Sequence, residues 1–127
     1  MRGITMHFTL EEYQERLSKV RQSMLEQELD VLIIHDPSNM SWLTGYDGWS
    51  FYVPQCVIVG PESDPIWFGR YHDANGAYRT AYMSVENITS YPDHYVMNPP
   101  LHPMDYLVEA VLTPRCWDRG RIGVEKD

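Results

Sequence analysis

The segment DVLIIHDPSNMSWLTGY, residues 30–46, contains the pattern that decides the fold. Its apolar run Val31–Ile34 is too short for a helix, and an uninterrupted run of this kind is typical of a strand covered on both faces. Residues 36–39 break the run, and residues 40–44 then predict a short helix that Gly45 ends. A strand followed so closely by a helix is the first indication of an α/β domain.

The segment upstream predicts a long helix over residues 9–27. Thr9 and Glu12 have the spacing of a capping box, and Phe8 and Tyr13 are placed to pack against each other across the helix start. Apolar residues then recur every three or four positions, which puts them on one helical face. These residues are Leu10, Tyr13, Leu17, Val20 and Met24.

The segment downstream predicts a mixed β-sheet flanked by helices. Residues 50–59 form a long apolar strand with Pro54 in its middle, which favours an edge position or a bulge. The hairpin that follows supplies antiparallel pairing, and the helices supply crossovers. The further elements expected are a hairpin loop over 60–65, a strand over 66–68, a helix over 72–83, a strand over 88–91, a helix over 103–112 and a strand over 121–125. We expect one domain over residues 1–127.

Composition excludes several classes of protein. Hydrophobic residues make up 43% of the chain and charged residues 22%, which is typical of a globular domain. The formal net charge of −8 argues against nucleic-acid binding, because phosphates would be repelled. The apolar runs are short and the start has no apolar signal core, so we predict no membrane span and a cytoplasmic protein. The two cysteines, Cys56 and Cys116, have no CxxC spacing and predict no disulfide framework.

Nothing in the histidine and cysteine pattern predicts a catalytic or metal site within the chain. The five histidines include no pair at the i, i+4 spacing of a helical metal site, and the HExxH motif is absent. Cys56 lies in an apolar strand and is interpreted as a core residue. We therefore expect no cofactor bound by these residues.

Two segments are candidates for ligand contact. Residues 46–52 (YDGWSFY) place aromatic side chains at a junction between a loop and a strand. They either pack beneath the hairpin or form a lid or subunit contact that presents rings to a ligand. Residues 69–75 (GRYHDAN) join a strand to a helix. Here Arg70 could bind a carboxylate, while Asp73 or Asn75 could simply cap the helix.

The motifs together resemble a known family. The patterns EEYxxRLxxVRxxM, DVLII, DPSNMxWLTGY and RIGVE are similar to the amino-terminal domain of the creatinase/prolidase family. This resemblance implies an α/β domain with a ribonuclease H-like motif, followed by a larger carboxy-terminal "pita-bread" domain. That second domain would hold the catalytic residues and any divalent metal. The chain stops directly after a predicted strand, so we expect it to be a piece of such a protein.

The resemblance also implies a function for the domain. It would be the non-catalytic part of a C–N bond hydrolase, in contact with its own carboxy-terminal domain and forming a homodimer with a small-molecule substrate at the subunit border. Counting from Gly45, a substrate-facing aromatic falls on Phe51, and an arginine that creatinase uses falls on Val53, which argues against creatine. The expected substrate-binding residues are Trp49, Phe51, Tyr52 and Arg70.

Three readings of the function stay open. The stretches 45–61, 69–80 and 91–96 resemble one particular hydrolase branch of the family. A Xaa-Pro dipeptidase or aminopeptidase, or creatinase itself, is the alternative within the family. A free-standing binding module without a catalytic domain is the alternative outside it.

Overall fold

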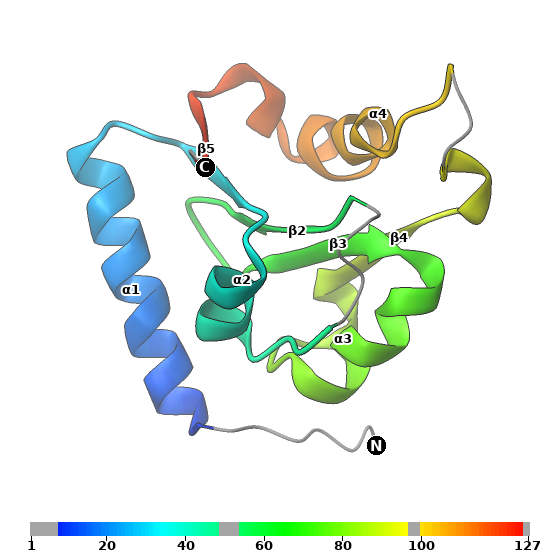
Figure 1. Cartoon of the computed structure of the whole chain (residues 1–127). Coiled ribbons are helices and arrows are strands. Elements are labelled where there is room, and N and C mark those ends of the chain that lie inside the picture. The colour runs from blue at the N-terminus through cyan, green and yellow to red at the C-terminus, as the bar shows by residue number, and fades with distance from the viewer. Residues whose placement is uncertain (1–7, 49–53, 97–99, 126–127) are drawn as a thin grey trace.

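The computed structural model describes residues 8–48, 54–96 and 100–125. Within them, a five-stranded sheet has the order β4-β3-β2-β1-β5 (Figure 1). The strands are β1 Val31–Ile34, β2 Cys56–Val59, β3 Ile66–Arg70, β4 Ile88–Tyr91 and β5 Ile122–Val124. The α-helices are α1 Leu10–Glu26, α2 Pro37–Thr44, α3 Ala74–Thr80 and α4 Pro103–Leu107.

The sheet is mixed, as the sequence predicts. The hairpin β2–β3 is antiparallel, and so is the pairing of β1 with β2. Strand β4 runs parallel to β3, and β5 runs parallel to β1. The parallel partners follow long connections that contain helices, which is the connection that parallel pairing requires.

Each face of the sheet carries its own apolar core. On one face, Val57 and Trp67 of the hairpin pack with the buried sides of α1, α2 and α3. On the other, Ile58 and Phe68 pack with Leu107 of α4 and with the helical turns that follow it. Strand residues alternate between the two faces because successive side chains point in opposite directions. The domain is therefore three layers deep, with helices on both sides of the sheet (Figure 1).

The first helix agrees with the prediction in its bounds and its cap. The Thr9 hydroxyl accepts a hydrogen bond from the amide of Glu12, and the rings of Phe8 and Tyr13 pack edge to face with centroids 6.1 Å apart. Tyr13, Leu17 and Met24 are buried, whereas Leu10 is 45% exposed. The predicted apolar face is thus wrong at its first member only.

The start of α2 corrects the sequence prediction. The helix begins at Pro37 and not at residue 40, because Asp36 caps it by accepting a hydrogen bond from the Asn39 amide. Proline at the first helical position is compatible with a helix, since its missing N–H has no intrahelical partner there. The residues interpreted as a break are therefore a helix start.

The position of the second strand is another correction. Strand β2 begins at Cys56 and lies in the middle of the sheet, so Pro54 is not inside the strand and the predicted edge position is wrong. The carbonyl of Pro54 instead accepts a hydrogen bond from the Tyr91 hydroxyl at 2.7 Å. The first part of the predicted strand, residues 50–53, lies outside the described residues.

The predicted elements after the hairpin are present, but their helices are shorter than predicted or differ in type. A 3₁₀ turn over Tyr71–Asp73 precedes α3, which ends at Thr80 and so is shorter than the predicted 72–83. Helix α4 continues as a π-helical turn over Val108–Leu112, within the predicted 103–112. Among the described residues, no helix is both long and apolar enough to span a membrane.

The residue that ends α2 also joins three helices. Gly45 has φ of +85°, in the left-handed region that glycine adopts without a steric penalty. A Cβ atom at this position would lie 2.8 Å from the carbonyl oxygen of Thr80 in α3 and 2.9 Å from the hydroxyl of Tyr13 in α1. Neighbouring Thr44 accepts a hydrogen bond from the Tyr82 amide through its carbonyl oxygen. Glycine is therefore required both by the backbone and by the space.

We predict that Gly45→Ala destabilises the domain by about 2 kcal/mol or more, because it combines left-handed strain with a backbone clash. Urea unfolding followed by circular dichroism measures this change. Gly76→Ala is the matched control: it lies inside α3, and an added Cβ would meet only Tyr46 at 3.7 Å. Alanine there is expected to be neutral or to stabilise by up to about 1 kcal/mol. Equal effects of the two substitutions would contradict the role given to Gly45.

We predict that the two cysteines differ sharply in reactivity. Burial raises the pKa of the Cys56 thiol to about 12, so it stays protonated at pH 8, whereas Cys116 is exposed. Because only the thiolate reacts, iodoacetamide should modify one thiol in the folded chain and two in denaturant. Mass spectrometry identifies the site, and Cys116→Ser should abolish the fast reaction. Rapid modification of Cys56 in the folded chain would refute its placement in the core.

Candidate functional site

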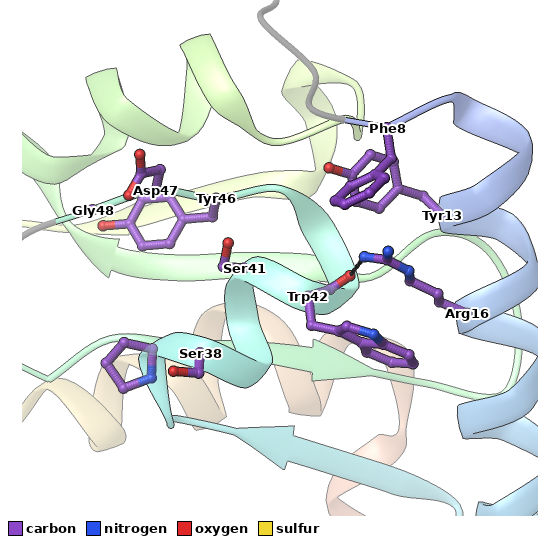
Figure 2. A pocket seen from close by; sticks show the side chains of 10 residues that line it. Phe8, Tyr13, Arg16, Ser38, Ser41, Trp42, Tyr46, Asp47 and Gly48 are labelled. Carbon is purple, nitrogen blue, oxygen red and sulfur yellow. Dashed lines mark hydrogen bonds between the residues drawn. The ribbon is translucent and has the colours of Figure 1, made fainter.

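An open pocket of about 500 Å³ lies between α1, α2 and the turn at residues 46–48 (Figure 2). Its walls are aromatic, with Phe8 and Tyr13 on one side and Trp42 and Tyr46 on others. Polar and charged groups are also present, and they come from all three segments. A concave aromatic surface with a few polar groups is the usual form of a small-molecule site.

Arg16 of α1 supplies the positive charge of the pocket. Its guanidinium lies 4.3 Å from the ring centroid of Phe8 and 5.2 Å from the ring of Trp42. Nε contacts a carboxylate oxygen of Glu12 at 3.2 Å, and Nη1 donates to the carbonyl of Trp42 at 2.7 Å. The side chain is only 11% exposed. Stacking and directed hydrogen bonds therefore hold this cation in one place.

Helix α2 supplies the hydroxyl groups. Ser38 and Ser41 are three positions apart, and Trp42 is four positions after Ser38, so all three share one face of the helix. The start of this helix is held by Glu125, which follows β5. One Glu125 oxygen accepts hydrogen bonds from the amides of His35 at 2.5 Å and Asp36 at 2.7 Å.

The second oxygen of Glu125 accepts a hydrogen bond from the side-chain amide of Asn39. Partial burial acts to raise the pKa of Glu125, but the hydrogen bonds from Asp36, Asn39 and His35 outweigh it and lower the pKa below its ordinary value. The ionised carboxylate at the helix N-terminus also interacts favourably with the helix dipole. Glu125 thus fixes the position of the helix that forms one wall of the pocket.

The turn after α2 supplies Tyr46 and Asp47. Tyr46 is buried, donates its hydroxyl hydrogen to the side-chain oxygen of Gln55 at 2.8 Å and packs against Trp67 with centroids 5.3 Å apart. Burial, with the nearby charge of Asp73, raises its pKa well above the ordinary value. Asp47 is exposed, and its amide donates to the Thr80 hydroxyl at 3.1 Å.

These contacts settle part of the prediction for the aromatic segment. For Tyr46, packing beneath the hairpin is confirmed, although its ring also borders the pocket. Trp49, Phe51 and Tyr52 lie outside the described residues, as does Val53, so the expectations for them stay predictions.

Arg70 is not brought into the pocket. It ends β3, and its Nε lies 3.3 Å from a carboxylate oxygen of Asp93, whose other oxygen is 3.3 Å from Nε2 of His72. Asp73 occupies the position before α3 but its side chain makes no capping hydrogen bond, and Asn75 lies inside the helix. Arg70 therefore pairs with a carboxylate of the same chain, and its contact with a substrate stays a prediction.

The family model for the creatinase/prolidase N-terminal domain matches residues 16–127. The chain belongs to this family. A curated relative, ectoine hydrolase of Halomonas elongata, is 59% identical over 124 residues, which are 98% of this chain and 31% of that protein. An uncharacterized hydrolase/peptidase of Sinorhizobium fredii is 42% identical over 94% of the chain and 31% of its own length. The chain thus spans about a third of the curated relatives that it matches.

Solved structures share the creatinase/prolidase fold. The N-terminal domain of a Xaa-Pro dipeptidase from Lactobacillus brevis has a TM-score of 0.70 at 16% identity, covering 87% of this chain and 75% of that one. A Xaa-Pro aminopeptidase from Streptococcus pyogenes has a TM-score of 0.68 at 17% identity, covering 94% and 78%. At these identities the likeness shows the fold alone. The predicted α/β domain with a mixed sheet is therefore confirmed.

Sequence reasoning missed the pocket of this creatinase/prolidase domain. In the sequence, Arg16 lies outside the apolar repeat of the first helix, and Trp42 lies within the predicted short helix over residues 40–44. The spacing of Glu12 and Arg16, four positions apart, was the available signal for an ion pair. Within the described ranges, no group of three or more histidine, cysteine or acidic side chains is placed to hold a metal. The expectation of a divalent metal in a further carboxy-terminal domain stays a prediction.

We predict that Glu125→Gln destabilises the domain by about 1–2 kcal/mol at pH 7, because it removes a charged acceptor from a helix N-terminus. Since folding lowers the pKa of Glu125, the stabilisation is complete above the ordinary glutamate pKa of about 4.3 and is lost as the pH falls through the lower folded-state value. Thermal unfolding of the unmodified chain and of Glu125→Gln between pH 7 and pH 3 measures whether the difference in their stabilities disappears at low pH.

The control for this prediction is Glu109→Gln, which neutralises an exposed glutamate on the other side of the sheet. It should change the free energy of unfolding by less than about 0.5 kcal/mol at pH 7. A Glu125→Gln effect that is independent of pH would contradict the assignment of an ionised cap.

Proposed function

We propose that this chain is the non-catalytic amino-terminal domain of a cytoplasmic ectoine hydrolase, which opens the ring of ectoine by hydrolysis of a C–N bond. The observation that carries the proposal is the 59% identity to ectoine hydrolase over 98% of the chain. The catalytic residues and any divalent metal would belong to a carboxy-terminal domain. The contribution of this domain would be to shape the active site and the interface of a homodimer.

The substrate-binding residues in this proposal are Trp49, Phe51, Tyr52 and Arg70. Aromatic rings suit a cyclic amidine such as ectoine, because its delocalised cation is attracted to the ring faces. Val53 stands where the family resemblance places the arginine of creatinase, which weakens the case for creatine. Ectoine also carries a carboxylate, and Arg70 already holds a carboxylate, that of Asp93, at 3.3 Å. Substrate binding by Arg70 would exchange one carboxylate for another.

A proline-specific peptidase is the second candidate. It is favoured by the fold of the Xaa-Pro dipeptidase and aminopeptidase domains, with TM-scores of 0.70 and 0.68. These matches have only 16% and 17% identity, however, and so concern the fold and not the substrate. A free-standing binding module is a third candidate, which a reading frame that ends after Asp127 would favour.

The test uses the protein encoded by the complete reading frame that contains this chain. We expect it to hydrolyse ectoine, with product formation followed by proton NMR, and to leave Xaa-Pro dipeptides and creatine intact. The 127-residue chain alone should be inactive with every added metal. Hydrolysis of Xaa-Pro dipeptides without hydrolysis of ectoine would overturn the proposal in favour of the peptidase.

Within the same protein, Phe51→Ala should reduce kcat/KM for ectoine by roughly 10-fold or more, corresponding to about 1.4 kcal/mol of lost transition-state stabilisation. Tyr71→Ala is the matched control, because it removes an aromatic ring that is 66% exposed. Its kcat/KM should stay within about twofold of the unmodified protein. Unchanged kinetics in Phe51→Ala would show that this ring does not contact the substrate.

A further inference from the structure

We propose that the exposed face of β5 is a docking surface for a helix formed by the residues that follow Asp127 in the complete protein. This β5 face consists of Ile122 and Val124, which are 38% and 66% exposed. The inference rests on one part of the proposed function, namely that a carboxy-terminal part follows this chain. It does not depend on the substrate.

The β5 face continues one of the two apolar cores of the domain. In the parallel pairing of the edge strand, Ile122 lies beside Val31 and Val124 lies beside Ile33. Paired residues of neighbouring strands point to the same side of a sheet. Val31 belongs to the core on the α4 side, and Ile33 packs against that core. The core therefore reaches the edge of the sheet, where its last two side chains remain exposed.

The opposite face of β5 is already filled. A Cβ atom at Gly123 would lie on that face, 2.6 Å from Cδ1 of Leu29 and 3.4 Å from Cδ1 of Leu32. Both leucines pack against the core on the α1 side. An additional helix against β5 therefore has a place on the β5 face and not on the opposite one.

The outer edge of β5 can also accept a further strand. Among residues 8–48, 54–96 and 100–125, β5 pairs with β1 alone and ends the sheet. Its outward backbone groups are thus available to polypeptide that returns alongside it. A parallel strand at this edge requires a crossover connection, which is usually a helix.

The connections already present predict the side on which such a helix lies. Strands β3 and β4 are parallel and joined through α3, on the α1 side of the sheet. Strands β4 and β5 run in the same direction at opposite edges and are joined through α4, on the other side (Figure 1). The two connections cross the sheet in opposite directions with helices on opposite faces, so they have the same hand.

Parallel connections are right-handed in nearly all proteins. A further connection from β5 to a strand beyond its free edge crosses the sheet in the same direction as the connection from β4 to β5. Its helix therefore lies on the α4 side, which is the side of Ile122 and Val124. The handedness of the fold and the exposed side chains thus indicate the same face.

The position of the β5 face in the chain favours a segment of the same polypeptide as its occupant. Val124 is close to residue 127 in the sequence, so residues that follow are tethered beside the face. A tethered segment has a high effective concentration, and a small apolar surface is enough to hold it. Separate proteins need roughly 800 Å² per partner for a stable interface, far more than two side chains provide. A second copy of the chain is therefore a poor occupant.

The experiment measures whether a thiol placed on the β5 face is covered in the complete protein. Val124→Cys is combined with Cys116→Ser, which removes an exposed native thiol. Val85→Cys in the same background is the matched control, because Val85 is 53% exposed and lies in the 3₁₀ turn before β4. Alkylation by iodoacetamide is followed by mass spectrometry of the peptide that contains each position. The buried thiol of Cys56 should stay unmodified, which verifies that each protein is folded.

Each variant is compared in three chains: residues 1–127, the same chain extended by roughly 40 residues, which is enough for a helix and a returning strand, and the complete protein. In the 127-residue chain, the two thiols should react at rates within about threefold of each other, since both positions are exposed. In the two longer chains, the thiol at position 124 should react more slowly by roughly 10-fold or more, because a covered thiol reacts only when the covering segment opens. The thiol at position 85 should keep its rate.

Equal rates at position 124 in all three chains would overturn the inference. Protection found only in the complete protein would also overturn it, because a remote part or a partner subunit would then cover the face. Protection already present in the 127-residue chain would indicate a second copy and would have the same consequence. In the complete protein alone, a thiol at position 124 that reacts as fast as one at position 85 is enough to overturn it. This comparison does not depend on the stability of the shorter chains.

Hydrolysis of ectoine, measured on the same complete protein, separates this inference from the proposed function. If the protein hydrolyses ectoine and the thiol at position 124 stays reactive, the inference fails and the proposed function stands. If the thiol is covered and ectoine is not hydrolysed, the proposed function fails and the docking surface stands.

Discussion

The left-handed turn at Gly45 is the constraint on which the helical side of this domain depends. Three helices meet where this residue has no side chain, with the Thr80 carbonyl and the Tyr13 hydroxyl occupying the space a Cβ would need. The turn directs the chain from α2 into Tyr46 and Asp47, one buried against Trp67 and the other exposed at the pocket. Burial of Tyr46 and exposure of Asp47 are thus two results of one backbone conformation.

A few charged side chains of the domain are held in fixed positions by their neighbours. Arg16 is stacked on rings and paired with Glu12, and the partly buried carboxylate of Glu125 accepts hydrogen bonds from the start of α2. In each case the cost of removing an ion from water is offset by hydrogen bonds to that ion. Arg70 and Asp93 form a more exposed version of the same arrangement at the end of β3. Each of these ions is therefore held in place by groups of the same domain, and Arg16 lies in addition beside the rings of Phe8 and Trp42.

The sequence predicts the parts of the fold that depend on local contacts. Helix α1 is predicted because its cap and apolar repeat involve residues three or four positions apart, and β1 because its apolar run is continuous. The start of α2 is missed because aspartate and proline, the residues at positions 36 and 37, are also common in turns. The edge position predicted from Pro54 is wrong because the proline precedes the strand.

The pocket could not be predicted because its walls come from separate elements. Arg16 and Trp42 are 26 positions apart, and nothing near either residue indicates the other. The family resemblance pointed to the aromatic segment after α2, of which the structure describes Tyr46 at the border of the pocket. Arg70 contacts Asp93 and is not among the residues that line the pocket, and its role in substrate binding stays a prediction.

The hydrogen bonds of Glu125 join residues up to 90 positions apart, and they have a consequence for synthesis of the protein. While the chain emerges from the ribosome, α1, α2 and the β2–β3 hairpin are complete long before residue 125 is added. Until then, the amides at the start of α2 lack their acceptor and β1 lacks its parallel neighbour. The sheet edge at β1 is covered only after residues 121–125 (RIGVE), which contain β5, have been synthesised. During this interval, the open side of β1 is exposed to chaperones and to other nascent chains.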